Sequence, residues 1–179
     1  MGIPNILSII RILLVPLFVT VYFSEIQFSN IYAALVYVVA GVTDMLDGLI
    51  ARKYNLTSKL GKVLDPLADK LITFTVIICI TIDKVIPLWA VVVFAVKELL
   101  MGLGGLIIHK KIADVPSSNY LGKSSTVIFF LVCTVLMVFR GIPADVANIL
   151  IAIAIGFTLI AFCGYLTTFS KLIKSGKAE

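Results

Sequence analysis

DMLDGLIARKYNLTSKLGKVLDPLAD, residues 44–69, places four aspartates, two glycines and an arginine within one short stretch. The sequence as a whole is apolar: 60% of its 179 residues are hydrophobic, only 14% are charged, and the mean hydropathy is +1.12. This composition is not that of an ordinary water-soluble domain, and it predicts an integral membrane protein. A group of carboxylates in such a chain therefore needs a physical explanation.

Apolar runs recur along the chain, and each approaches the ~20 residues that a helix needs to cross ~30 Å of hydrocarbon. We predict an all-α, polytopic membrane protein with six transmembrane helices in one bundle. Because the joining loops are short, a single domain over residues 1–179 is expected. The first run lacks a preceding basic segment, so we do not expect a cleaved signal peptide. The predicted spans are residues 6–24, 30–52, 61–82, 86–108, 121–140 and 145–169.

The distribution of basic residues predicts the orientation, because Lys and Arg favour cytoplasmic loops. With both termini in the cytoplasm, only Lys84 and Arg140 fall on the opposite side, while Arg11 and Lys97 lie inside predicted spans. The net charge of +5 is then explained by topology and by attraction to anionic lipid, and nucleic-acid binding is not expected. The cytoplasmic cations are Arg52, Lys53, Lys59, Lys62, Lys70, Lys110, Lys111, Lys123, Lys171, Lys174 and Lys177.

The four aspartates form two pairs at helical spacing. Asp44 and Asp47 are three residues apart near the cytoplasmic end of the second span, so both side chains project from one face. Asp65 and Asp69 are four apart at the start of the third span. One ionised carboxylate inside a membrane costs at least ~2.5–3.5 kcal/mol on insertion scales, and neighbouring carboxylates also repel each other. We therefore expect positive charge between the two pairs.

Divalent metal is the candidate that this pattern favours, because hard oxygen ligands suit Mg²⁺ or Mn²⁺ and two such ions balance four carboxylates. A two-metal site is typical of phosphoryl chemistry. Gly48 and Gly61 would let a ligand approach the backbone, and Arg52 offers a planar donor fork to a diphosphate. Spacing alone still permits a cation transporter or a polyprenyl transferase. A transporter would favour carboxylates near the membrane midplane, whereas these acids lie near one face beside a basic loop.

The same residues resemble the signature of the CDP-alcohol phosphotransferase family, with no position missing. The resemblance implies a membrane enzyme that transfers the phosphatidyl group of CDP-diacylglycerol to an alcohol and releases CMP. It further implies that Asp44, Asp47, Asp65 and Asp69 surround two metal ions, with Asp69 also the general base. The nucleotide site would be lined by Asp47, Gly48, Ala51, Arg52 and Gly61. The matching pattern is Asp44-x₂-Asp47-Gly48-x₂-Ala51-Arg52-x₈-Gly61-x₃-Asp65-x₃-Asp69.

Other parts of the chain bear on the acceptor alcohol. The opening GIPNILSIIRILLVPLF is similar to the start of bacterial phosphatidylglycerophosphate synthases, which use glycerol 3-phosphate. Lys97-Glu98 resembles an Arg-Glu pair of that subfamily, and Gly105 stands where a further arginine is expected. Having fewer cations there favours the alternative of a cardiolipin synthase, with phosphatidylglycerol as acceptor. The predicted acceptor-binding residues are Lys97, Lys123 and Arg11.

The resemblance also implies a homodimer in the bacterial inner (plasma) membrane, with an active site that faces the cytoplasm. A buried cation such as Lys97 would serve the acceptor, because intramembrane charges are usually functional. Pairing of Lys97 with Glu98 is not expected, since adjacent residues on a helix do not face each other.

Overall fold

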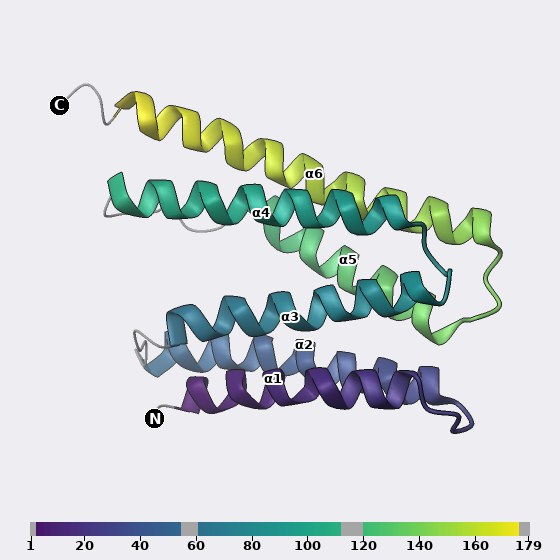
Figure 1. The fold of residues 1–179 in the computed structure, drawn as a ribbon. Helices are drawn as coiled ribbons and strands as arrows, with labels where there is room; N and C mark the ends of the chain where they lie inside the picture. Colours follow the sequence, from purple (N-terminus) through teal and green to yellow (C-terminus); the bar gives the residue numbers. More distant parts are fainter. Residues whose placement is uncertain (1–2, 55–60, 112–119, 176–179) are drawn as a thin grey trace. The chain divides into compact units, whose positions relative to one another are not determined.

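The computed structural model describes residues 3–54, 61–111 and 120–175, and these ranges contain six α-helices and no β-strand (Figure 1). The prediction of an all-α chain with six helices is confirmed, and each helix overlaps the span expected for it. The helices are α1 Ile3–Tyr22, α2 Ser29–Tyr54, α3 Gly61–Ile82, α4 Leu88–Lys111, α5 Tyr120–Val138 and α6 Ala144–Ser175.

The end of α3 illustrates how local chemistry sets a helix boundary. The N–H of Val85 donates to the carbonyl of Ile80 at 2.9 Å, and the N–H of Lys84 donates to that of Thr81, also at 2.9 Å. Lys84 is in the left-handed region, with φ of 60°. These features form a Schellman motif, which satisfies carbonyls that the helix end would leave unpaired. Helix α4 then begins directly after Pro87.

The helices fall into two compact units, and the first contains α1, α2, α3 and the end of α5 (Met1–Val85 and Cys133–Ile142). Within this unit α1 packs against both α2 and α3, and these three helices lie side by side in Figure 1. Phe18 of α1 is fully buried, as are the small residues Ala33 and Ala40 of α2. Small side chains let helices approach closely, as is common in membrane bundles. Close packing of α1 brings its polar residues within reach of the acids on α2 and α3.

The second unit contains Ile86–Val132 and Pro143–Glu179, and in it α4 packs against α6. Phe94 of α4 stacks on Phe129 of α5, with ring centroids 4.7 Å apart. Lys97 and Glu98 of α4 are buried, so two charged side chains of this unit lie in an apolar setting.

By length and composition, two stretches could cross a membrane: Ser29–Leu49 in α2 and Ala144–Thr167 in α6. Ile6–Tyr22 and Ser124–Val138 are shorter apolar stretches. In α3 four charged residues lie within the first ten, so only its later part is continuously apolar. Many large apolar side chains, Leu99 among them, are exposed on the helices, which is unfavourable in water and suits contact with lipid.

Candidate active site

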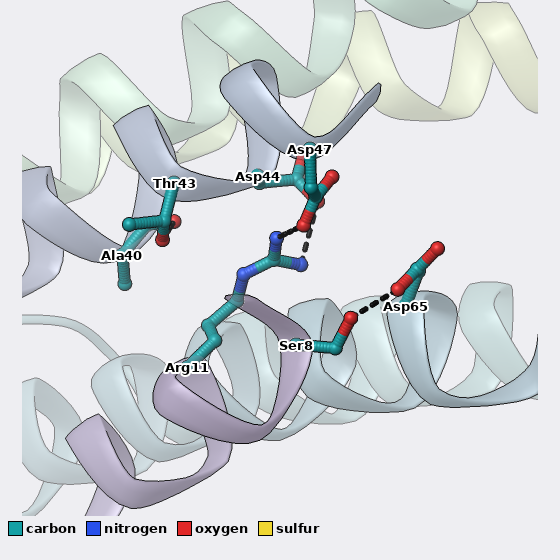
Figure 2. A network of polar contacts seen from close by, with 7 residues as sticks. All are labelled: Ser8, Arg11, Ala40, Thr43, Asp44, Asp47 and Asp65. Carbon is teal, nitrogen blue, oxygen red and sulfur yellow. Dashed lines mark hydrogen bonds and ion pairs between the residues drawn. The ribbon is translucent and has the colours of Figure 1, made fainter. Parts of the chain in front are cut away.

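A buried arginine lies between the first pair of aspartates (Figure 2). Arg11 of α1 donates from Nη1 to Asp44 Oδ1 at 2.6 Å and from Nη2 to Asp47 Oδ2. The side chain of Arg11 is 1% exposed and that of Asp47 is 4% exposed, whereas Asp44 is 47% exposed. One guanidinium reaches both carboxylates, which confirms that Asp44 and Asp47 project from the same face of α2. The positive charge was predicted between the two pairs, and Arg11 supplies it within the first pair.

A second contact connects α1 to the other acid pair. Ser8 precedes Arg11 by three residues, so both side chains lie on the same face of α1. The Ser8 hydroxyl donates to Asp65 Oδ1 of α3, and Ser8 is fully buried. Acids from two helices are thus held by one turn of a third helix (Figure 2). By contrast, the neighbouring Thr43 hydroxyl donates to the carbonyl of Ala40 in its own helix at 2.7 Å.

The remaining predicted residues of the acidic motif lie on the same two helices. Asp69 is half-buried, one turn beyond Asp65 in α3, and Gly61 is the buried first residue of that helix. Gly48 lies in α2 one residue after Asp47, and no described atom lies within 4 Å of the position that a Cβ would take there. Apart from the backbone of its own helix, the space beside Gly48 is therefore open. The side chains of Ala51 and Arg52 in α2, and of Lys123 in α5, lie outside the described part of the structure.

The model of the CDP-alcohol phosphatidyltransferase family matches residues 1–160, which include every element of this acidic site. The chain belongs to this family. It is therefore a CDP-diacylglycerol-dependent transferase of phospholipid biosynthesis, and the alternative of a cation transporter loses its basis.

Curated relatives of the chain include enzymes of two names. A CDP-diacylglycerol–glycerol-3-phosphate 3-phosphatidyltransferase of Bacillus subtilis (strain 168) is 29% identical over 191 residues, which cover 95% of this chain and 94% of the relative. The enzyme of that name from Rickettsia bellii is 32% identical over 170 residues, which cover 93% of this chain and 89% of the relative. A cardiolipin synthase (CMP-forming) of Streptomyces coelicolor is 38% identical over 128 residues, which cover 69% of this chain but only 59% of the relative.

Members of the CDP-alcohol phosphatidyltransferase family generally depend on divalent metal, and the donor set of this site fits such an ion. Asp44, Asp47 and Asp65 offer carboxylate oxygens, which are the ligands that Mg²⁺ and Mn²⁺ prefer. In their present arrangement, however, the described residues contain no group of three or more His, Cys, Asp or Glu side chains placed to hold one ion. Arg11 stands between the first two carboxylates instead. The ligands are chemically suitable, and their arrangement is that of an arginine-paired site.

Lys97, a predicted acceptor residue of this transferase, is ion-paired to Glu98. This contact corrects the expectation from helix geometry that adjacent side chains would not meet. Both side chains are buried among apolar neighbours, and Lys97 Nζ also lies 5.1 Å from the centroid of the Phe94 ring. A long, flexible lysine can bend toward its neighbour, and the lack of water strengthens the attraction between the two charges.

Sequence reasoning did not assign Ser8 to the site, and it assigned Arg11 only to the acceptor. A signal for Arg11 was present in the sequence. Arg11 is the cation near the start of the first span, and antiparallel packing puts that start beside the end of α2 and the beginning of α3. A buried arginine at the same membrane level as four carboxylates is expected to pair with them.

The open space beside Gly48 leads to a prediction about the nucleotide site. Gly48→Leu is expected to reduce CMP affinity by about tenfold or more while the protein stays folded, because the new side chain would fill the ligand's space. Calorimetric titration with CMP and thermal unfolding measure the two effects. Gly156→Leu in α6 is the matched control, since a Cβ there also meets no described atom. Unchanged CMP affinity in the Gly48 variant would contradict a nucleotide site at this position.

Proposed function

We propose that this CDP-alcohol phosphatidyltransferase transfers the phosphatidyl group of CDP-diacylglycerol to glycerol 3-phosphate, giving phosphatidylglycerophosphate and CMP. The observation that carries this proposal is the near full-length similarity to two relatives named for that reaction, over 95% and 93% of the chain. Arg11 and Ser8, in the opening segment that resembles this subfamily, lie against the family's acidic motif, which supports the same assignment.

The acidic motif would hold two divalent ions, Mg²⁺ or Mn²⁺, through Asp44, Asp47, Asp65 and Asp69. Bound ions neutralise a diphosphate and align it for displacement. The nucleotide would occupy the open side of α2 and the start of α3, along Gly48, Ala51, Arg52 and Gly61. Arg52 would donate to the diphosphate through its planar guanidinium, whose geometry matches two phosphate oxygens.

Asp69 is the proposed general base. It would accept the proton of the glycerol 3-phosphate hydroxyl as that oxygen attacks the phosphorus that bears diacylglycerol. A new P–O bond forms to the acceptor, the P–O bond to CMP breaks, and CMP leaves with the electron pair. Placement one turn beyond Asp65 on α3 supports this role, because it puts a second carboxylate close to the proposed metal ligands.

Acceptor binding is assigned to Lys97, Lys123 and Arg11. Lys97→Ala is expected to raise the apparent KM for glycerol 3-phosphate by about tenfold or more, and that for CDP-diacylglycerol far less, because a charged hydrogen bond to the acceptor phosphate is lost. Steady-state kinetics with each substrate varied in turn measures the difference. Glu98→Gln is the control, because it removes the ion-pair partner and keeps the lysine. Equal effects of Lys97→Ala on both substrates would indicate a structural role.

Cardiolipin synthesis with phosphatidylglycerol as acceptor is the second candidate. It is favoured by the Streptomyces coelicolor relative, although this chain spans only 59% of that protein. Lys at position 97 and Gly at position 105 also leave fewer cations than a pocket for a phosphate dianion would favour. The deciding experiment offers purified protein glycerol 3-phosphate, phosphatidylglycerol, serine and inositol phosphate, and identifies the lipid product. Phosphatidylglycerophosphate supports the first proposal, and cardiolipin supports the second.

The cellular setting follows from the substrates. CDP-diacylglycerol has tails that belong in the bilayer and a diphosphate that belongs at its surface. We propose a homodimer of six-span subunits in the inner (plasma) membrane, each one domain over residues 1–179, with both termini and the acidic site at the cytoplasmic face. The basic residues predicted for that side support this orientation.

A further inference from the structure

The contacts of Arg11 leave part of its donor capacity unused. Its guanidinium is divided between two carboxylates, with one terminal nitrogen on Asp44 and the other on Asp47. Its Nε is buried and has no hydrogen-bond partner within the described residues. A buried donor without a partner is costly, so this pairing does not satisfy all that the arginine can donate.

The atoms that Arg11 engages are also those that the proposed function requires for metal. Asp44 Oδ1 and Asp47 Oδ2 accept from the guanidinium, and both residues belong to the proposed metal ligands. An arginine and a divalent ion at the same oxygens would repel each other, most strongly at Asp47, because Arg11 and Asp47 are buried and poorly screened while Asp44 is partly exposed. The two cations therefore compete for one pair of carboxylates.

We propose that Arg11 is the resident counter-cation of the acidic site, which holds Asp44 and Asp47 together without metal and is displaced from them when a divalent ion binds. This inference rests on the proposed function. Moving a buried arginine off its partners costs free energy, and that cost lowers the metal affinity of the wild-type protein. Arg11 is a positioning residue in this scheme: it keeps two like charges close together until the ion arrives.

The test is Mn²⁺ binding to the detergent-purified full chain without any substrate, followed by the electron paramagnetic resonance signal of free Mn²⁺. Arg11→Met removes the competing charge and keeps an unbranched apolar side chain. It is expected to bind Mn²⁺ more tightly by about 5–150-fold, the usual size of coupling between two sites. Arg11→Lys keeps the charge and is expected to stay within about threefold of the wild type.

Thr43→Val is the matched control, since Thr43 precedes Asp44 and donates only to its own helix in the described contacts. The Mn²⁺ affinity of Thr43→Val should equal that of the wild type.

Thermal unfolding provides a second, independent measurement. Arg11→Met should unfold at a lower temperature without metal, because two carboxylates lose their partner, and Mn²⁺ should raise its Tm more than that of the wild type.

A measurement on the wild type needs a variant only to assign one resonance. The chain has three arginines, Arg11, Arg52 and Arg140, and the spectrum of Arg11→Lys identifies the Nε–H resonance of Arg11. Addition of Mg²⁺ should shift this resonance as the guanidinium leaves the carboxylates. An unchanged Arg11 resonance in wild-type protein that has bound Mg²⁺ would overturn the proposal, as would equal or weaker Mn²⁺ binding by Arg11→Met.

The same data separate this inference from the proposed function. If the wild type transfers phosphatidyl groups with Mn²⁺ but Arg11→Met binds the ion no more tightly, only the role of Arg11 is wrong. If neither protein binds Mn²⁺, the metal site and the competition are both wrong. If Arg11→Met binds Mn²⁺ in the absence of substrate and the wild type does not, the result supports the proposal that Arg11 competes with the ion for Asp44 and Asp47.

Discussion

Removal of divalent metal with excess EDTA is expected to reduce phosphatidyl transfer to background, and added Mg²⁺ or Mn²⁺ should restore it. Asp44, Asp47 and Asp65 carry more negative charge than the single guanidinium of Arg11 can balance. A diphosphate brought to these acids without further cations would be repelled, and its leaving group would lack charge stabilisation. CMP release from CDP-diacylglycerol in the presence of glycerol 3-phosphate is the measurement.

Two controls make this result specific to the metal. EDTA already saturated with Mg²⁺ should leave turnover unchanged. Circular dichroism should show that the helices persist in EDTA, because the ion pairs of Arg11 and the hydrogen bond of Ser8 hold α1, α2 and α3 together without any ion. Full turnover in excess EDTA would contradict the two-metal proposal.

Helix positions could be predicted because apolar runs of about the length of a membrane crossing mark them directly. The expected span 61–82 matches α3, Gly61–Ile82, at both ends. The last helix was expected over 145–169 but continues to Ser175. Hydropathy records where a segment is apolar, whereas a helix can continue into residues such as Lys171 and Lys174 that are good helix formers.

The sequence predicted six membrane-spanning helices, and the number of helices was predicted better than the number of stretches that meet the length and composition of a span. Four charged residues in the first ten positions of α3 interrupt its apolar run, and within the described ranges only stretches of α2 and α6 are long and apolar enough to cross a membrane. Two of these charged residues, Asp65 and Asp69, belong to the acidic motif. Residues that weaken the membrane signal of α3 are thus the same residues that we propose as metal ligands and base.

Within the site, spacing along one helix was a better guide than pairing between helices. The three-residue interval from Asp44 to Asp47 predicted a shared face, and their common partner confirms it. That partner is Arg11, and its position depends on how α1 packs against α2. The spacing of residues along a single helix does not predict this packing. The ion pair of Lys97 with Glu98 was missed for a related reason: regular helix geometry describes Cβ directions, whereas burial decides where a long side chain bends.

Asp69→Asn is expected to lower turnover by about 10²–10⁴-fold, the usual contribution of a general base, while metal-dependent binding of CDP-diacylglycerol is largely kept. The amide retains the shape and one oxygen of the carboxylate but cannot take up the acceptor's proton. Asp69 lies one turn beyond Asp65 on α3, so the two acids can be compared within one helix.

Asp65→Asn should behave differently, because it removes charge at the proposed metal ligands and should weaken both binding and turnover. Asn at this position can still accept from the Ser8 hydroxyl, so the contact between α1 and α3 need not be lost. Ser8→Ala removes that hydrogen bond alone and serves as the control for its structural contribution. Calorimetric titration of each variant with CDP-diacylglycerol in detergent and Mg²⁺, alongside turnover, gives the comparison. If Asp69→Asn loses binding as severely as Asp65→Asn, Asp69 is chiefly a metal ligand, and the base must be sought elsewhere in the site.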